Sequence, residues 1–408
     1  MIWSSMALVV LDAVDSPDIM QTMTKDQHGV AVVGCGALAQ MMHLPHVVSN
    51  PRTKLVVACD LDRDTAEACR SRFGAERAET DWHQVVASRD VDLIILATHT
   101  NLRAELIVPA LHAGKPVYTE KPLANSIEEM HTIVRASRET GVPVCVGHNR
   151  RSSPAMLEFR RLVEKALNGA RPTAPTMDRS VNRAPIPEES RMQILIRIND
   201  DCRSWKDWIF HDPQGILYAE MVHFIDLALW LNPSKPVKVF AEGSRCGNFA
   251  IVLRFEDGSI TTMHHSLSGH FDYPKELFEC TVRHFSIAME QHIEIRQCGF
   301  DDEPALKVFP YDSECSWAVQ KGVAGYFREM EAERRRAKAV GGNPKWLNVN
   351  KGHYDHLDRF LDCIEGRGSN PCDAADSVPV IVVAHKLQAA IDEGCPLSII
   401  SDELEASL

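Results

Sequence analysis

A glycine-rich stretch near the start of the chain has the residue types and spacing that a dinucleotide pyrophosphate requires. Gly34, Gly36 and Ala39 fit the pattern G-x-G-x-x-G/A, and Ala37 and Leu38 belong to the same loop. The first glycine allows a sharp turn, the second allows close approach of the backbone, and the alanine allows close packing of helix on strand. Free N–H groups at the start of the following helix would then face the phosphates.

Asp60 completes this motif. The apolar stretch 55–59 predicts a strand, and Asp60 follows it, about twenty residues after Ala39. A carboxylate at this place accepts hydrogen bonds from the adenosine ribose hydroxyls, and it repels a 2′-phosphate. The order of strand, turn, helix, strand and acid makes a chance glycine turn a poor explanation. We therefore expect the chain to bind NAD in preference to NADP.

Lys121 is the first candidate for proton chemistry. Glu120-Lys121-Pro122 follows the predicted strand 117–119, and ligands of open α/β sheets bind at the carboxyl ends of the strands. A lysine that is partly desolvated beside a positively charged nicotinamide has a lowered pKa, so it can hydrogen-bond a substrate hydroxyl and help move its proton. A surface lysine followed by a capping proline explains the position equally well.

Three further ionisable side chains share one face of an apolar predicted helix. Glu220, His223 and Asp226 are spaced three residues apart within residues 216–231. The surrounding residues are apolar almost throughout, which predicts that the helix is buried on most sides. Buried ionisable groups need partners or a purpose. A lone core histidine is usually only hydrogen-bonded, but three such groups on one face weaken that interpretation.

Strands and helices alternate through the first 148 residues. Apolar β-favouring stretches predict strands at 30–33, 55–59, 92–97, 117–119 and 143–146. Helical patterns cover 39–50, 62–73, 103–113 and 127–140. Pro45 lies inside the first of these, which predicts a bent or split helix. The alternation predicts a Rossmann-type, doubly wound parallel sheet with helices on both faces.

The pattern changes after about residue 150. Predicted helices cover 155–167, 216–231, 321–339, 353–365 and 377–393, and predicted strands cover 192–198, 237–265 with a hairpin turn at Asp257-Gly258, 277–283 and 292–298. This predicts a second, α/β domain with a large, mostly antiparallel open sheet. We expect an N-terminal tail (1–28), a dinucleotide-binding domain (29–148) and a substrate-binding and oligomerisation domain (149–408), with C-terminal helices able to pack back on the first. The tail is expected to be disordered or to reflect an over-extended gene start, and an arm on a neighbouring subunit is the alternative.

Composition excludes several classes of protein. The net charge of −12 argues against general nucleic-acid binding. The 12 cysteines contain no C-x-x-C pair and indicate reduced thiols in the cytoplasm, not a disulfide framework. No apolar stretch reaches the ~20 residues that span a bilayer. No arrangement of histidines and cysteines predicts a metal site.

These motifs resemble the Gfo/Idh/MocA family, the group of glucose–fructose oxidoreductase and inositol dehydrogenase. The matching segments cover nearly the whole chain from about residue 29: GCGALA, ACD, AGKPVYTEKP, VGHNRRSSP, HDPQGILYAEMVHFIDLALWL and, less specifically, YPKE. The resemblance implies a Rossmann domain and a C-terminal α/β domain whose open sheet often forms the interface of a homo-oligomer, a dimer or tetramer. It also implies reversible oxidation of one hydroxyl of a sugar or cyclitol with NAD or NADP.

The resemblance assigns roles to single residues. Lys121 corresponds to the lysine that contacts the reacting hydroxyl, and His223 corresponds to the histidine that acts as acid and base. Asp226 corresponds to an aspartate that supports the histidine or touches the substrate. Asn149 and Arg150 correspond to a segment that lines the pocket near the nicotinamide.

Two positions depart from the family pattern. In many dehydrogenases of the group an aspartate lies four residues before the histidine, where this chain has Ala219, and Glu220 is expected to replace it on the same helical face. The loop after the third main strand carries His99 and Arg103 where the family has proline and histidine, which bears on the nicotinamide-side contacts and on the substrate.

The expected site has three parts. The catalytic candidates are Lys121, His223, Glu220 and Asp226. The cofactor-binding candidates are Gly34, Gly36, Ala37, Leu38, Ala39, Asp60, Thr98, His99, Asn101, Glu120, Lys121 and Asn149. The substrate-binding candidates are Lys121, Asn149, Arg150, Trp208 and His223.

Residues 150–206 hold twelve Lys or Arg against seven Asp or Glu, on an acidic chain. Ordinary surface charge explains this excess. The alternative is an anionic sugar held through charge-assisted hydrogen bonds by one or two of Arg179, Arg183, Arg191, Arg203 and Lys206. Trp205 and Trp208 would stack on a sugar face or fill the core.

Three functions fit these observations. The first is an NAD-dependent dehydrogenase of a sugar or cyclitol. The second is an NAD-dependent glycosidase, in which transient oxidation, elimination, hydration and reduction return the cofactor to its starting state. The third is a cofactor-binding regulator without enzymatic activity. Accumulation of NADH separates the first function from the second.

Overall fold

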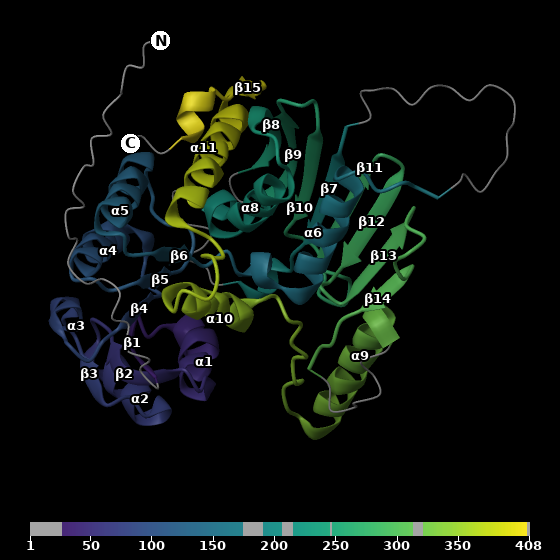
Figure 1. Ribbon diagram of the computed structural model, residues 1–408. Coiled ribbons are helices and arrows are strands. Elements are labelled where there is room, and N and C mark those ends of the chain that lie inside the picture. Colours follow the sequence, from purple (N-terminus) through teal and green to yellow (C-terminus); the bar gives the residue numbers. More distant parts are fainter. Residues whose placement is uncertain (1–26, 174–190, 206–214, 245–246, 313–320, 406–408) are drawn as a thin grey trace, which may run out of the picture.

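The computed structural model describes residues 27–173, 191–205, 215–244, 247–312 and 321–405. These residues form two sheets, each with its own covering helices (Figure 1). The predicted tail up to residue 26, the stacking candidate Trp208 and the cations Arg179, Arg183 and Lys206 lie outside the described residues.

The first sheet has six parallel strands in the order β3-β2-β1-β4-β5-β6. In chain order they are β1 His28–Val33, β2 Thr53–Cys59, β3 Arg77–Glu79, β4 Leu93–Leu96, β5 Val117–Thr119 and β6 Val144–Val146. The helices around it are α1 Leu44–Ser49, α2 Arg63–Phe73, α3 Trp82–Ala87, α4 Arg103–His112 and α5 Ile127–Thr140. Most of its strands are buried on both faces, as expected for apolar runs covered by helices. The predicted doubly wound Rossmann fold is confirmed.

Short side-chain contacts fix the ends of the predicted helices. Asp62 caps α2 by accepting hydrogen bonds from the N–H groups of its first turn, and α2 ends at Gly74 in the left-handed conformation. Ser126 and Glu129 form a reciprocal capping box at the start of α5. The edge strand β3 and helix α3 were not predicted, because a half-buried strand of three residues and a six-residue helix carry little periodic signal.

The helix after the glycine loop is split, as Pro45 predicted. Residues Ala39–His43 form a π-helical turn, and α1 continues from Leu44 with Pro45 in its first turn. Proline has no N–H to donate to the preceding turn, and it is tolerated where a helix starts afresh. A wider turn followed by a new helix start therefore accommodates it.

The second sheet has nine strands in the order β14-β13-β12-β11-β7-β10-β9-β8-β15. In chain order they are β7 Gln193–Asn199, β8 Pro236–Ser244, β9 Gly247–Phe255, β10 Ile260–Ser266, β11 Glu276–Val282, β12 Phe285–Glu290, β13 Glu294–Cys298, β14 Leu306–Val308 and β15 Leu397–Ser398. Among the described strand pairs of this second sheet, only β7 with β10 is parallel, so the prediction of a mostly antiparallel sheet is confirmed.

One predicted strand boundary in this sheet is wrong. The strand expected at 292–298 begins at Glu294, because residues 291–293 form the turn between β12 and β13, with Gln291 and His292 as its first two residues. Both of these residues have φ near +56°, a left-handed conformation that non-glycine residues rarely adopt. The side chains of both residues make contacts that are described below.

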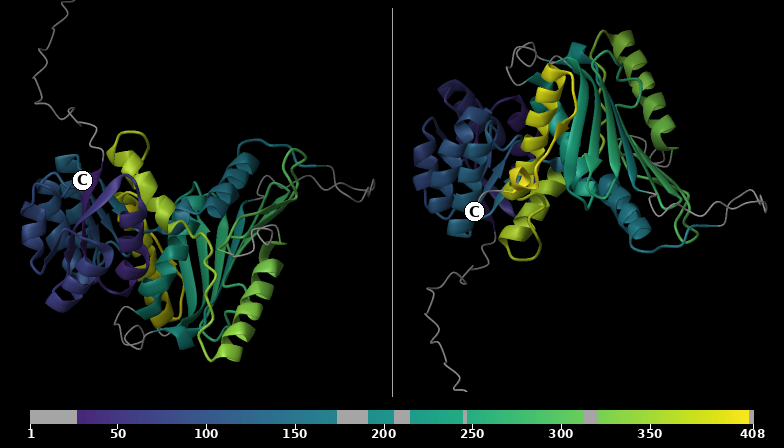
Figure 2. Two further views of the ribbon diagram at one scale, coloured as in Figure 1. Left: turned by 90° about the horizontal axis from the view of Figure 1, so that it is seen from below. Right: turned by 90° about the horizontal axis from the view of Figure 1, so that it is seen from above.

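Two helices of the C-terminal part, α10 His353–Ile364 and α11 Ser377–Glu393, lie between the two sheets (Figure 2). The other described α-helices of this part are α6 Pro154–Leu167, α8 Val222–Leu231 and α9 Gly322–Val340. Helix α10 shares a buried cluster with the first sheet through residues such as Phe360 and Tyr118. Among the described residues, Ala374–Glu393 is one helical stretch long and apolar enough to cross a membrane. More than half of it is buried against its neighbours, as in a core helix.

Candidate active site

The glycine loop is shaped for close contact from outside. Gly34 has φ of +91°, and a Cβ there would meet the carbonyl oxygen of Ala97 at 2.6 Å. A Cβ on Gly36 would meet nothing within 4 Å, and Gly36, Ala37 and Leu38 are all exposed. The first glycine is therefore needed for the turn, and the second leaves open space where a pyrophosphate can reach the backbone.

Asp60 is fixed at the rim of this loop. Its Oδ2 accepts a hydrogen bond from the N–H of Cys35 at 2.8 Å, and its Oδ1 accepts one from the N–H of Asp62 at 3.0 Å. Thr98 and His99 follow β4 at the same carboxyl edge of the sheet. These residues, with the buried Ala39 where the helix meets the strand, fit NAD at this edge. Asn101 also lies in this loop, but its side chain is not among those described.

A buried histidine and carboxylate pair lies beside the candidate lysine. The His43 Nε2 lies 2.8 Å from the Glu120 Oε1, and both side chains are buried. Burial disfavours the charged carboxylate, yet the hydrogen bond and charge of His43, with Lys121, lower the pKa of Glu120 to about 2. This contact could not be predicted from the sequence, because His43 lies in a π-helical turn and 77 residues separate it from Glu120.

Arg103 holds the loop that carries Glu120 and Lys121. Its buried guanidinium donates to the carbonyl oxygens of Glu120, Pro122 and Thr98, the last at 2.9 Å. The Lys121–Pro122 peptide bond within this loop is cis. Burial lowers the pKa of Arg103 to about 10. Arg103, which departs from the family pattern, therefore holds the backbones of two loops, the one after β4 and the one after β5.

Lys121 reaches from the first sheet to the second domain. Its Nζ donates a hydrogen bond to the carbonyl oxygen of Ala219, in the π-helical turn Leu217–Met221 that precedes α8. Burial lowers the pKa of Lys121, and Arg150 adds to this effect, against the opposing charges of Glu220 and Glu120. A lysine with these surroundings is placed to donate a hydrogen bond to a substrate oxygen and to exchange a proton with it.

His223 follows in the first turn of α8. It is only 7% exposed, and its Nδ1 is buried with no hydrogen-bond partner among the described residues. Its ring meets that of His148 edge-on, with centroids 5.9 Å apart. Burial, together with the positive charges of Arg150 and Lys121, lowers the pKa of His223 well below its ordinary value. The charge of Lys121 contributes to this shift, so the two side chains lie near each other, and the region between them is called the crevice below.

Glu220 and Asp226 have other partners than the sequence suggested. Glu220 pairs with the Lys275 Nζ at 2.8 Å and lies 3.7 Å from the Arg150 Nη2, and no described contact joins it to His223. The π-helical turn widens the spacing here, so three residues along the chain do not place Glu220 beside His223. Asp226 is buried and accepts hydrogen bonds from the Arg151 Nε and Nη2, the shorter at 2.6 Å. This contact suits a supporting residue.

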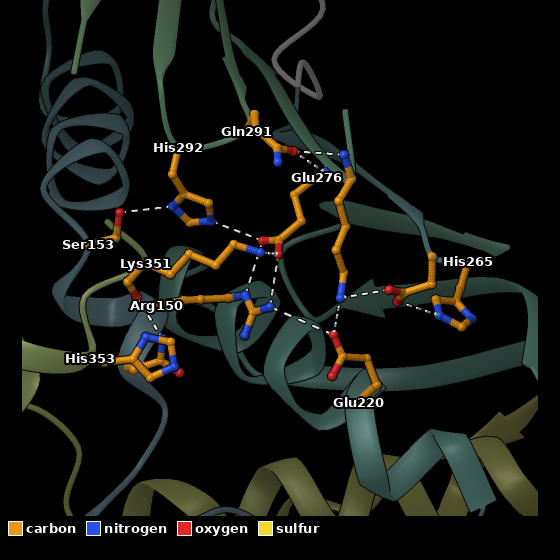
Figure 3. A network of polar contacts seen from close by, with 12 residues as sticks. Arg150, Ser153, Glu220, His265, Glu276, Gln291, His292, Lys351 and His353 are labelled. Carbon is orange, nitrogen blue, oxygen red and sulfur yellow. Dashed lines mark hydrogen bonds and ion pairs between the residues drawn. The ribbon is translucent and has the colours of Figure 1, made fainter. Parts of the chain in front are cut away.

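Glu276 is the centre of a buried ionic network (Figure 3). It is fully buried, and it accepts hydrogen bonds from the Arg150 Nε at 3.0 Å, the Lys351 Nζ at 2.6 Å and the His292 Nε2 at 2.9 Å. Burial disfavours its charge, but Arg150 and Lys351 hold the pKa of Glu276 well below its usual range. These partners come from the loop after β6, the segment before α10 and the β12–β13 turn.

Lys275 extends this network toward the second π-helical turn. Its Nζ lies 2.8 Å from both the Asp200 Oδ1 and the Glu220 Oε1. Figure 3 shows Arg150 between Glu276 and Glu220, so it connects the two ends. Burial, outweighed by the two carboxylates Glu220 and Asp200, leaves the pKa of Lys275 above its usual range. The Gln291 Oε1 accepts a hydrogen bond from the Lys275 backbone N–H at 2.7 Å. This bond ties the β12–β13 turn to the start of β11.

Asn149, the residue before Arg150, is held by residues before and at the start of α10. Its Nδ2 donates to the Lys351 carbonyl oxygen at 2.7 Å and lies 3.4 Å from the His353 Nδ1. Burial lowers the pKa of His353 to about 4. Sequence analysis missed Lys351 and His353 as site residues. It missed Lys275 and Glu276 too, although the segment YPKE that contains them was noted.

Arg191 and Arg203, the two described arginines that were candidates for holding an anionic sugar, have other neighbours. Arg203 pairs with Asp201, its neighbour two residues before. Arg191 lies against the β9–β10 turn at Gly258. The cations of the crevice are instead Lys121, Arg150, Lys275 and Lys351.

Comparison with known proteins agrees with this architecture. Residues 28–148 match the family model described as oxidoreductase family, NAD-binding Rossmann fold. The 4-carboxy-2-hydroxymuconate-6-semialdehyde dehydrogenase of Sphingobium sp. is 32% identical over 126 residues, which cover 31% of this chain and 40% of that enzyme. The myo-inositol 2-dehydrogenase of Thermotoga maritima is 23% identical over 259 residues, covering 61% of this chain and 71% of that enzyme.

Solved structures share the fold over almost the whole chain. An oxidoreductase domain protein from Kribbella flavida superposes with a TM-score of 0.70 at 18% identity, covering 92% of this chain and all of that one. The scyllo-inositol dehydrogenase of Lactobacillus casei, solved with bound NAD(H) and scyllo-inositol, superposes with a TM-score of 0.65 at 16% identity, covering 91% of this chain and 99% of that one. At such identities the likeness shows the fold.

Proposed function

Since the chain belongs to the Gfo/Idh/MocA oxidoreductase family, with an NAD-binding Rossmann domain, we propose that it is an NAD-dependent dehydrogenase of a sugar or cyclitol. One observation carries the proposal. Lys121 of the first domain meets the turn that precedes His223 of the second domain, at the edge where the glycine loop and Asp60 fit NAD. A substrate in this crevice would touch both side chains.

The two side chains divide the work on one hydroxyl group. Bound NAD supplies the acceptor for the hydride. The neutral imidazole of His223 accepts the hydroxyl proton, and Lys121 donates a hydrogen bond to the oxygen that becomes negative. The cations that lower the pKa of His223 also stabilise that developing charge, so a weak base is sufficient.

The remainder of the crevice suits a molecule with several hydroxyl groups. Lys351 and Arg150 are already paired with Glu276, so their remaining N–H groups can donate hydrogen bonds without adding an isolated charge. Such a lining favours a polyol over an apolar alcohol. A carboxylate-bearing sugar fits as well, since Lys351 and Lys121 each have further N–H groups to donate.

We propose that a second copy of this chain covers the outer face of the nine-stranded sheet. The opposite face packs on α6, α8 and α11, while alternate residues of the central strands point outward, among them Leu195, Val252 and Ile260, each more than a third exposed. Light scattering on the purified chain should give a dimer or tetramer, and Val252→Asp should reduce it toward the monomer.

A panel of sugars, cyclitols, uronates and aryl glycosides with NAD tests the proposed reaction. Absorbance of the reduced nicotinamide and release of aglycone are followed together. NADH that accumulates with a sugar or cyclitol supports the dehydrogenase. Released aglycone without net NADH would show the glycosidase instead.

Variants at the crevice complete this test. Lys121→Ala and His223→Ala should retain NAD binding and lose turnover. If a cellular phenotype of the gene survived both substitutions, the function would be that of a cofactor-binding regulator.

A further inference from the structure

A second concave site lies outside the candidate active site. It is a groove of about 650 Å³ between α6, the end of α8, α10 and the segment before α11. This volume is in the usual range for small-molecule sites. The lining includes Arg151, Arg160, Glu164, Trp230, Arg359 and Asp376.

Arginine dominates the charged lining of this groove. Four arginines, Arg151, Arg160, Arg161 and Arg359, face two carboxylates, on a chain whose net charge is −12. The charge of Arg151 is neutralised, because Arg151 pairs with the buried Asp226 at 2.6 Å and with Asp376 of the groove at 2.8 Å. Arg160 pairs with Glu164, and Arg161 pairs with Glu158 and Glu303. Arg359 is thus the arginine of this lining for which the described residues offer no carboxylate partner.

Two of these arginines are held in place by neighbours. The Arg160 guanidinium lies 4.1 Å from the centroid of the Trp230 ring, and its Nε donates to Glu164 at 2.6 Å. The Nη1 of Arg359 donates to the Ser152 Oγ at 3.2 Å and to the carbonyl oxygen of Arg151 at 3.4 Å. A guanidinium fixed in this way loses little conformational freedom when it binds an anion.

Arg359 has donors to spare. Among the residues that the structure describes, no carboxylate pairs with it, and its Nε and Nη2 have no hydrogen-bond partner there. Burial lowers the pKa of Arg359, and the positive charges of Arg160 and Arg151 add to the effect. An oxyanion between these guanidinium groups would satisfy the spare donors and offset the local repulsion.

We propose that this groove binds the oxyanion of a small hydroxylated molecule, a sugar phosphate or a sugar carboxylate. Arg359 and Arg160 hold the oxyanion. Glu164 and Asp376, at the rim, accept hydrogen bonds from hydroxyl groups. The proposal does not depend on which reaction the crevice at Lys121 performs.

Calorimetric titration with inorganic phosphate tests the groove. The full chain is first saturated with NAD, so that the glycine loop cannot take the phosphate, and ionic strength is kept low. One saturable site is expected, and Arg359→Gln should weaken it at least about tenfold, since it removes a charge-assisted pair. Arg335→Gln on α9 makes the same charge change outside the groove and should bind phosphate as the wild type does.

Either of two results would overturn the proposal: no saturable binding by the NAD-loaded chain, or equal affinity in the Arg359→Gln and Arg335→Gln variants. If Arg359→Gln does not fold, Arg160→Gln decides in its place, and unchanged affinity there also overturns it. Titration of the wild type and of Arg359→Gln with glucose 6-phosphate and with gluconate then identifies the preferred oxyanion, because the affinity lost in the variant belongs to the groove and not to the crevice. Neutral glucose that loses as much affinity in Arg359→Gln as both anions would contradict an oxyanion site.

Discussion

Two π-helical turns flank the segment Glu120-Lys121, and they act on it differently. The turn Ala39–His43 belongs to the first domain and presents a side chain, since His43 pairs with Glu120. The turn Leu217–Met221 belongs to the second domain and presents its backbone, since the Ala219 carbonyl oxygen accepts from Lys121. Such turns often mark functional sites, because they place a group where a regular helix would not.

The difference separates positioning from chemistry. The first turn fixes a carboxylate next to the lysine and has no described contact with the amine. The second turn contacts the amine and carries Glu220 into the ionic network around Lys275. Changes at the second turn and its partners should therefore have larger effects than changes at the first.

Removal of the lysine amine should have the largest effect. Lys121→Ala is expected to lower kcat by about a thousandfold, the size of a general acid–base contribution, while the Kd for NAD changes little. Steady-state kinetics and fluorescence titration measure the two quantities. Lys54→Ala, an exposed lysine of β2, is the matched control and should keep full activity. Equal activity of the two variants would show that the contact with the second turn has no chemical role.

Loss of Lys275, which anchors the second π-helical turn through Glu220, should have the next largest effect. Lys275→Met leaves Glu220 and Asp200 without their shared cation, and removing one partner of a buried pair costs about 3–5 kcal/mol of unfolding free energy. Urea unfolding measures this loss. Lys307→Met removes a half-exposed pair with Glu158 and should cost less than about 1 kcal/mol. A loss in Lys275→Met as small as this would mean that the network does not hold the turn.

The first turn should show its effect as a dependence on pH. The folded-state pKa of Glu120 is lowered from 4.5 to about 2, so its contribution to stability is present above pH 4.5 and is lost as pH falls toward 2. His43→Ala removes the pairing, so the variant should unfold at a higher pH than the wild type. Circular dichroism during acid titration measures the midpoint. His43→Gln keeps a donor for Glu120 and should restore most of the difference; identical midpoints in all three proteins would contradict the pairing.

Replacement of the proline that splits the first helix should have the smallest effect. In Pro45→Ala the reason for a new helix start disappears, but the contact of His43 with Glu120 remains to hold the π-helical turn. Stability should change by less than about 1 kcal/mol, and NAD affinity should be unchanged. A large loss of NAD affinity would mean that Pro45 itself maintains the turn.

Sequence patterns predicted the fold and the meeting of Lys121 with the His223 helix. Continuous apolar runs predict buried parallel strands, and the carboxyl ends of such strands share one edge, so the glycine loop, Asp60 and Lys121 could be placed together. The partners of Glu220 could not be predicted, because a π-helical turn changes the helical spacing without a clear sequence signal. Glu276 was missed because its partners Arg150, Lys351 and His292 come from distant segments.

The anchor of Lys121 in the second domain is a peptide carbonyl, and this has a consequence for position 219. Every amino acid supplies the same carbonyl oxygen, so the docking of the amine tolerates any side chain there that leaves the turn intact. The chain can thus have alanine where many relatives have an acid and still hold the amine against the second domain. Substitutions at position 219 that preserve the turn should therefore leave the lysine attached to the second domain.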